Sequence, residues 1–179
     1  MQDFNQTLTP GDIEKGIVNV VVEIPIGGTD KIEWNRIDKM MEIDRQEPTA
    51  FPEPTNYGFI PQTISEDGDG MDVLIISEKI IPTGTILQAR IIGVMKFEDE
   101  TEVDDKIIVV PIDNHEDKNQ VDSLADFSKQ KINQISYYFS HYKDQIKSGL
   151  TVVKGWGDVV EAKQIIYKSI ERWNNLKTN

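Results

Sequence analysis

The sequence predicts an α+β protein, mainly β, in which a small barrel of strands is followed by helices packed on its outside. Short β-branched and apolar segments, separated by glycine and proline turns, fill the first two thirds of the chain. The last third changes to a helical period. Strands followed by helices are typical of α+β proteins, and several short strands bent by glycines favour a small barrel.

The expected strands, in order, are residues 17–24, 31–34, 40–45, 71–77, 85–97, 107–110 and 151–154. The strand 17–24 is apolar enough to be buried, and the strand 31–34 alternates polar and apolar residues. Gly93 predicts a bulge or bend within its strand. After Arg45, three prolines beginning at Pro48 and an expected turn at residues 56–58 predict an irregular, extended loop.

The expected helices occupy the last third of the chain. The first runs from about Asp126 to Ser148 and ends at Gly149. Its apolar face is made by Ile132, Ile135, Phe139, Tyr142 and Ile146. The second begins at Asp158, which forms a capping box with Glu161, and carries apolar residues as far as Trp173.

Length and composition limit the number of domains and the classes of protein to which the chain can belong. The 179 residues show no repeat or long linker and fit one domain, residues 1–179. No apolar run approaches the roughly 20 residues that span a bilayer, and the N-terminus lacks a leader pattern, so we expect a soluble, cytoplasmic protein without membrane contact. The net charge of −12 argues against a general nucleic-acid binder.

The cysteine and histidine content limits which disulfides, nucleophiles and metal sites the chain can have. The chain has no cysteine, which excludes disulfides, a thiolate nucleophile and cysteine zinc sites, and which suits a reducing compartment. With only His115 and His141, the sequence offers little for zinc binding through histidine. Any metal site is therefore expected to use oxygen ligands.

The stretch Asp67-Gly68-Asp69-Gly70-Met71-Asp72 concentrates three carboxylates in six residues, directly before an apolar strand. Carboxylates this close repel one another and raise each other's pKa, so bound cations would stabilise them near neutral pH. Oxygen ligands favour hard metals, and an open acidic loop suits Mg²⁺, which keeps several waters and uses substrate phosphates as ligands.

Two other interpretations of this loop remain open. A calcium-binding EF-hand would place ligands at Asp67, Asp69 and Glu78. It is disfavoured because Met71 stands at the fifth position, Asp72 stands at the glycine position, and a strand follows where a helix is required. An acidic surface turn fits the loop taken alone.

A second acidic segment runs from Glu98 through Asp99 and Glu100 to Asp104, Asp105 and Lys106, again beside an apolar strand. Two acidic turns at strand ends, one hairpin length apart, are able to meet at one rim of a barrel, although two independent solvated turns would give the same pattern. Glu23 either points outward from its buried strand or faces a polar site, because an isolated buried carboxylate is costly.

Taken together, these motifs give a resemblance that spans about Gly16 to Trp173. They are Glu23-Ile-Pro, Lys31-Ile-Glu33, Asp44-Arg45, Asn56-Tyr57-Gly58, Asp67-Gly-Asp69-x-x-Asp72-Val-Leu, Gly93-Val-Met-Lys, Asp99-Glu100, Asp104 with Lys106, His141-Tyr142-Lys143-Asp144 and Gly155-Trp156. Their order and spacing resemble those of the soluble family I inorganic pyrophosphatases.

The resemblance implies a five-stranded OB-like barrel with flanking strands and two C-terminal helices outside it. It also implies hydrolysis of pyrophosphate to two phosphates with several Mg²⁺ ions, for which Mn²⁺ is a substitute, and a homo-oligomer, a hexamer in chains of this size. Asp69 would accept the proton of the metal-activated water. The implied metal ligands are Asp67, Asp72, Asp99, Asp104 and Glu33. The implied phosphate ligands are Lys31, Arg45, Tyr57, Lys106, Tyr142 and Lys143, with Glu23 and Glu100 supporting the site.

Two positions depart from the family pattern. Gly70 replaces the usual proline of the signature, which should make the acidic loop costlier to order by about 1 kcal/mol. Glu53 stands where the family usually has a tyrosine, and a carboxylate there would repel substrate or recruit another cation. We expect both changes to weaken metal affinity or to raise the required Mg²⁺ concentration without removing catalysis. A barrel-shaped binding module without turnover and a metal-dependent phosphatase of broader specificity are the alternative functions.

Overall fold

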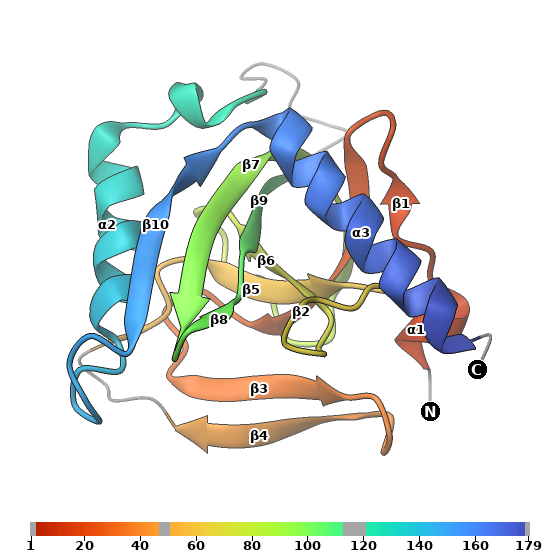
Figure 1. Ribbon diagram of the computed structural model, residues 1–179, viewed down its shortest axis with the longest axis horizontal. Coiled ribbons are helices and arrows are strands. Elements are labelled where there is room, and N and C mark those ends of the chain that lie inside the picture. Colours follow the sequence, from red (N-terminus) through yellow and green to blue (C-terminus); the bar gives the residue numbers. More distant parts are fainter. Residues whose placement is uncertain (1–2, 47–50, 113–120, 178–179) are drawn as a thin grey trace.

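The computed structural model describes residues 3–46, 51–112 and 121–177. Its centre is a closed five-stranded barrel (Figure 1). Around the barrel run β2 (Ile17–Ile24), β5 (Asn56–Ile60), β6 (Met71–Ile75), β9 (Lys106–Pro111) and β7 (Ile86–Asp99). Pairing of β7 with β2 closes the ring. The β6–β9 pair is parallel and the other barrel pairs are antiparallel, which confirms the predicted barrel.

Further elements surround the barrel. The remaining strands are β1 (Gly11–Asp12), β3 (Asp30–Asn35), β4 (Met40–Gln46), β8 (Glu102–Val103) and β10 (Thr151–Gly157). The helical elements are α1 (Phe4–Thr7), the 3-10 turn η1 (Leu124–Asp126), α2 (Lys129–His141) and α3 (Val159–Lys177). β3 and β4 form a separate two-stranded sheet below the barrel in Figure 1. In the described part of the chain, neither long helix has an apolar stretch long enough to cross a membrane.

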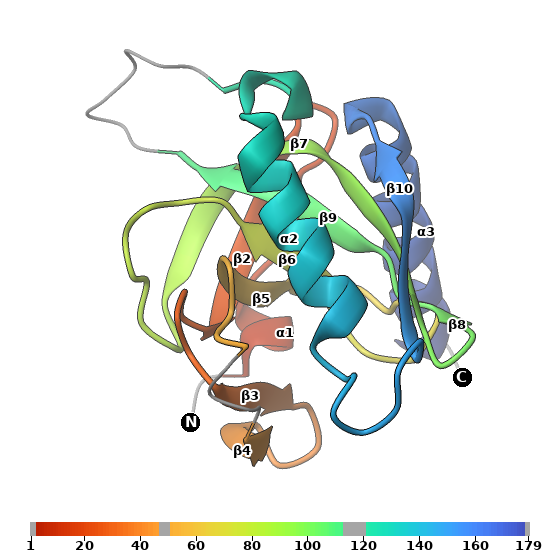
Figure 2. The ribbon, with the colours of Figure 1, turned by 90° about the vertical axis from the view of Figure 1, so that its left-hand side faces the viewer.

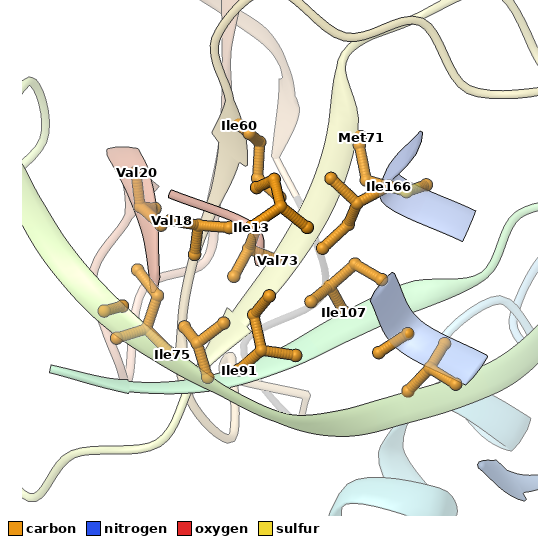
Figure 3. Packing of buried hydrophobic residues seen from close by; sticks show 14 of the residues in the cluster. Ile13, Val18, Val20, Ile60, Met71, Val73, Ile75, Ile91, Ile107 and Ile166 are labelled. Carbon is orange, nitrogen blue, oxygen red and sulfur yellow. The ribbon is translucent and has the colours of Figure 1, made fainter. Parts of the chain in front are cut away.

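The barrel is filled by β-branched side chains that point inward from its strands. Ile75, Ile91 and Ile107 meet in the interior, and Ile166 of α3 joins them (Figure 3). A second apolar cluster lies between the outside of the barrel and α2, which crosses the sheet in Figure 2, and includes Phe97 and Phe139. Both helices therefore pack on the outside of the barrel, as the sequence predicts.

Two glycines are required by close backbone contacts. At Gly58 a Cβ atom would lie 2.1 Å from Val21 O on the neighbouring strand, and at Gly93 it would lie 2.7 Å from Gly157 O. The predicted bulge is confirmed, because the register between β7 and β9 shifts between Ile91 and Gly93.

Three sequence predictions were wrong in detail. Residues 56–58 form part of β5 and not a turn. The helix expected from 126 to 148 spans Lys129–His141, so Ile146 lies beyond it and is 73 % exposed. β10 runs as far as Gly157. Pro48 and His115 lie outside the described residues.

The start of α3 follows the predicted cap. Asp158 Oδ1 accepts a hydrogen bond from Glu161 N at 2.9 Å. The carboxylate of Glu161 pairs with Lys96, with 2.8 Å between Oε1 and Nζ. The capping residue thus fixes the beginning of the helix, and Glu161 also ties the helix to β7.

Candidate active site

A pocket of about 200 Å³ lies where one rim of the barrel meets the β3–β4 hairpin and the end of α2. Of the residues predicted for the site, all line this pocket except Lys143 and Glu100. The predicted residues in its wall are Glu23, Lys31, Glu33, Arg45, Tyr57, Asp67, Asp69, Asp72, Asp99, Asp104, Lys106 and Tyr142. Segments far apart in the sequence therefore meet in one polar cavity.

Strand pairing explains why the two acidic segments meet. β6 and β9 are parallel and begin at the same rim, and the register of Val73 against Ile107 sets Asp72 beside Lys106. β7 runs antiparallel to β9 and ends at that rim, which brings Asp99 to the same place. The alternative of two independent solvated turns does not describe this arrangement.

Lys106 is the most buried charge of the pocket. Its side chain is 4 % exposed, and its Nζ pairs with Asp104 Oδ1 at 2.6 Å and with Asp72 Oδ2. Burial alone would lower the pKa of Lys106, but the two carboxylates outweigh burial and raise the pKa well above its usual value. Lys106 therefore stays protonated and offsets one of the two negative charges of the partly buried Asp72 and Asp104.

The carboxylates of the pocket carry an excess of negative charge. Burial raises the pKa of Asp104 to about 7, with Lys106 opposing the shift and Asp72 adding to it. Burial also raises the pKa of Asp67, although a hydrogen bond from Asp69 N opposes it. Burial is the main cause of both shifts, and the negative charge of Asp72 adds to each, so a bound cation would favour the ionised form of these carboxyl groups.

The other acidic groups pair with cations of the chain. Lys31 Nζ lies 2.5 Å from Glu33 Oε1, and Lys143 Nζ lies 2.7 Å from Asp99 Oδ2. Over residues 3–46, 51–112 and 121–177, no three acidic or histidine side chains are arranged to hold a metal ion. The donor chemistry nevertheless fits Mg²⁺, because oxygen-only ligands with surplus negative charge suit a hard divalent cation.

Glu23 faces the pocket and does not point outward. It is 6 % exposed, and its Oε1 accepts a hydrogen bond from Trp34 N at 2.8 Å. Burial raises its pKa well above the usual value, and the nearby charge of Asp72 adds to this. Glu23 thus joins the hairpin backbone to the barrel at the pocket.

Two half-buried tyrosines supply hydrogen-bond donors. Burial raises the pKa of Tyr57 well above its usual value, and the carboxylates of Asp72 and Asp104 contribute. Burial and the charge of Asp99 likewise raise the pKa of Tyr142. Both phenols therefore keep their protons at neutral pH and are able to donate hydrogen bonds to an anionic ligand.

Lys143 and Glu100 do not line the pocket. Lys143 lies behind the pocket wall, where its Nζ donates to both carboxylate oxygens of Asp99 at 2.8 and 2.7 Å. The side chain of Glu100 is 63 % exposed, and its Oε1 lies 3.7 Å from Lys143 Nζ. Lys143 thus contacts the pocket through Asp99, and Glu100 contacts Lys143.

Arg36 is a pocket residue that sequence reasoning missed. It follows β3 and donates from Nη2 to Asp69 Oδ1 at 3.1 Å and to Gly68 O. The hairpin carrying Arg36 is also anchored by Trp34, whose ring meets Phe4 edge to face at 4.6 Å. Arg36 lies in a polar turn, where the sequence has no hydrophobic periodicity. Its partner Asp69 is 33 positions away, so no local sequence pattern indicates that the two residues pair.

Glu53 also lines the pocket, as its place in the sequence pattern suggests. Its carboxylate, however, is engaged by the protein, because Tyr138 Oη donates to Glu53 Oε1 at 2.8 Å. Gly70 lies against Phe59, and a Cβ atom there would meet Phe59 Cδ2 at 3.3 Å. The two departures from the family pattern thus lie in different walls of the pocket.

Comparison with known proteins agrees with this geometry. The family model described as inorganic pyrophosphatase matches residues 20–174. An inorganic pyrophosphatase of Neisseria meningitidis serogroup B is 56% identical over 174 residues, which are 97% of this chain and 98% of the relative. One from Haemophilus influenzae is 55% identical over 174 residues, 97% of this chain and 99% of the relative.

Solved structures give the same result. The crystal structure of an inorganic pyrophosphatase from Neisseria gonorrhoeae superposes with a TM-score of 0.94 at 56% identity, covering 96% of this chain and 99% of that one. The inorganic pyrophosphatase from Thermus thermophilus superposes with a TM-score of 0.87 at 30% identity, covering 97% of this chain and 99% of that one. The chain therefore belongs to the inorganic pyrophosphatase family.

Proposed function

We propose that this protein hydrolyses inorganic pyrophosphate to two orthophosphates in a Mg²⁺-dependent reaction. The observation that carries the proposal is Lys106, buried between Asp72 and Asp104 in a pocket that also holds Lys31 and Arg45. Phosphoryl transfer to water needs neutralised charge and aligned groups more than covalent catalysis. A pocket that mixes buried carboxylates with several cations meets that need.

Metal ions would be held by Asp67, Asp72 and Asp104, with Asp99 and Glu33 contributing ligands. The surplus carboxylate charge around Lys106 supports this assignment. When bound, Mg²⁺ supplies charge neutralisation for phosphate and lowers the pKa of water. Mn²⁺ accepts the same oxygen ligands and should substitute.

The chain's own donors would hold the substrate. Lys31, Lys106 and Arg45 give charge-assisted hydrogen bonds to phosphate oxygens, and Arg45 offers a bidentate fork. Tyr57 and Tyr142 add neutral donors because their phenols remain protonated. We assign Lys143 to the same group, with Asp99 as its partner before substrate enters.

Asp69 would accept the proton of the attacking water. Its side chain is 79% exposed at the pocket mouth, which gives it access to water, and Arg36 holds its Oδ1. A positioned carboxylate contributes to general base catalysis by taking the proton as the new bond forms. Glu23 and Glu100 would support the site, Glu23 through the backbone of Trp34 and Glu100 through Lys143.

We further propose that residues 1–179 form one domain and that copies assemble into a homo-oligomer, with a hexamer as the expected form. In the part of the chain that the structure describes, Ile37 is 89 % exposed and Ile80 is 72 % exposed, and an interface between copies would be able to cover such side chains. Native mass spectrometry measures the number of subunits.

A cytoplasmic location agrees with the absence of cysteine.

The test is phosphate release by purified protein from pyrophosphate, tripolyphosphate and ATP, with Mg²⁺, with Mn²⁺ or with a chelator. We expect rapid release from pyrophosphate that requires the metal. Comparable turnover of ATP would instead indicate a phosphatase of broader specificity. A folded protein without turnover under any of these conditions would indicate a binding module.

A further inference from the structure

A buried hydrogen bond links the loop before β5 to helix α2. Glu53 is 9 % exposed and Tyr138 is 5 % exposed, and Tyr138 Oη donates to Glu53 Oε1 at 2.8 Å. The two residues are 85 positions apart, so this contact joins distant parts of the chain. Burying a carboxylate is unfavourable unless it is hydrogen-bonded, and the phenol supplies such a bond.

The backbone of Glu53 is fixed independently of its side chain. Glu53 N donates to Gly28 O at 2.9 Å, and Gly27 N donates to Glu53 O at 2.9 Å. Glu53 lies between Pro52 and Pro54, whose rings hold their own φ angles near about −65°. The backbone of Glu53 is therefore held against the turn that follows β2, and this fixes the point from which its carboxylate extends.

Tyr138 carries this restraint to the pocket. Its ring stacks on the ring of Tyr142 at 5.4 Å between centroids with 9° between planes, and Tyr142 N donates to Tyr138 O at 2.9 Å. Tyr142 is the C-cap of α2, and its Oη lies 3.4 Å from Asp99 Oδ2 in the pocket. The orientation of the Tyr142 phenol thus depends on where the Tyr138 ring is held.

We infer that Glu53 is a positioning residue, which acts through Tyr138 to fix the Tyr142 phenol at the pocket wall. The kinetic consequence rests on the proposed function, in which Tyr142 binds a phosphate oxygen. An electrostatic role, in which the Glu53 charge repels substrate or attracts a cation, makes a different prediction. Glutamine at position 53 keeps an oxygen that accepts from Tyr138 but removes the charge.

The kinetic experiment compares KM and kcat for pyrophosphate in Tyr138→Phe, Glu53→Gln and the wild type. Tyr138→Phe keeps the ring and loses the restraint, so we expect KM to rise by about 10-fold. Glu53→Gln should stay within about twofold of the wild type. The matched control is Tyr137→Phe, which removes the hydroxyl of the neighbouring exposed tyrosine and should leave KM unchanged.

A double-mutant cycle shows whether the effect passes through Tyr142. In a Tyr142→Phe background, Tyr138→Phe should raise KM no further, since residues acting through one contact are not additive. An unchanged KM in Tyr138→Phe, or an equal rise in both backgrounds, would overturn the inference. Equal changes in Glu53→Gln and Glu53→Ala would assign the effect to charge.

A second measurement does not depend on turnover. The chain has five tyrosines, so protein labelled at the tyrosine rings gives a simple NMR spectrum in which Tyr142→Phe identifies the Tyr142 signal. Tyr138→Phe and Glu53→Ala should shift and broaden the Tyr142 signal. In Glu53→Gln the Tyr142 signal should match that of the wild type, and the signal of Tyr167 on α3 should not change in any of these variants. A Tyr142 signal identical to that of the wild type in Tyr138→Phe refutes the positioning role, whether or not the protein hydrolyses pyrophosphate. Absence of hydrolysis with the expected shift would refute only the proposed function.

Discussion

Replacing Lys106 with methionine would remove the buried cation that pairs with two partly buried carboxylates. Lys106 Nζ pairs with Asp104 Oδ1 at 2.6 Å and with Asp72, and its side chain is 4 % exposed. Methionine keeps the unbranched apolar stem, which packs where Nζ lies 5.7 Å from the Tyr57 ring. The substitution therefore tests charge compensation with little loss of volume.

The expected loss of stability is large. Removing one partner of a buried ion pair costs about 3–5 kcal/mol, because the remaining charge stays desolvated. In a chain of this size, 1 kcal/mol shifts Tm by about 2–4 °C, so metal-free Lys106→Met should melt about 6–20 °C below the wild type. Asp104, whose pKa is raised to about 7 by burial, is able to bind a proton instead, so the loss should be smaller near about pH 6 than near about pH 8.

Thermal unfolding followed by circular dichroism, with a chelator and with Mg²⁺, measures this loss. Lys96→Met is the matched control, because Lys96 Nζ also pairs with two carboxylates, Asp105 at 3.1 Å and Glu161 at 2.8 Å, but its side chain is 30 % exposed. Exposed pairs contribute less than about 1 kcal/mol. Mg²⁺ should stabilise Lys106→Met more than the wild type, since binding to the folded state offsets the missing charge.

Two results would refute this reasoning. The first is a metal-free Lys106→Met protein that melts within about 2–4 °C of the wild type and no lower than Lys96→Met. The second is an equal gain from Mg²⁺ in Lys106→Met and wild type, which would mean that cations do not replace the lysine charge at these carboxylates.

Three further predictions concern the same pocket. Because burial raises the pKa of Asp104 to about 7, the metal-free folded protein binds more protons than the unfolded chain between about pH 4 and 7. Its free energy of unfolding should fall by up to about 4 kcal/mol as pH rises through that window, measured by urea unfolding, and a stability that rises instead would be inconsistent with a raised pKa. Gly70→Pro should lower the Mg²⁺ concentration for half-maximal activity by about fivefold through reduced loop entropy, provided that Phe59 yields a few tenths of an ångström; an unchanged Mg²⁺ requirement would count against this. Arg36→Ala should raise that concentration by about fivefold, because it releases Asp69 and its loop, whereas a Mg²⁺ titration that coincides with the wild type would remove Arg36 from the site.

The barrel was predictable because its strands carry strong local signals. Residues 17–24 and 107–110 are β-branched runs bounded by turns, and such runs report burial directly. The closing pair of β7 with β2 joins segments about 70 positions apart and has no local signature, so it could be expected only from the resemblance. Helix α3 follows from its cap and its period together.

β5 was missed because its turn-forming residues serve long-range contacts. Asn56 Oδ1 accepts hydrogen bonds from Ile26 N at 3.0 Å and from Ile81 N at 2.9 Å. This asparagine therefore satisfies backbone N–H groups of two other loops and does not form a turn. Gly58 allows β2 to approach closely. Composition alone does not distinguish such residues from turn residues.

The end of α2 was overestimated for a similar reason. Ile146 continues the apolar period, but the helix ends at His141 and Lys143 reaches across to Asp99 at 2.7 Å. That ion pair forms between residues 44 positions apart, and helical periodicity does not report it. The acidic groups of the pocket were predictable from their clustering, whereas their pairing with individual cations depends on the folded geometry.

The measurement that most directly tests the proposed chemistry compares Asp69→Asn with Asp67→Asn in phosphate release from pyrophosphate across a Mg²⁺ titration. If Asp69 is the base, its loss should lower kcat by about 10²- to 10⁴-fold at every Mg²⁺ concentration, with the fold intact by circular dichroism. Asp67→Asn should shift the Mg²⁺ requirement upward and recover activity as Mg²⁺ increases. Recovery of Asp69→Asn at high Mg²⁺ would show that Asp69 serves metal binding and would contradict its role as the base.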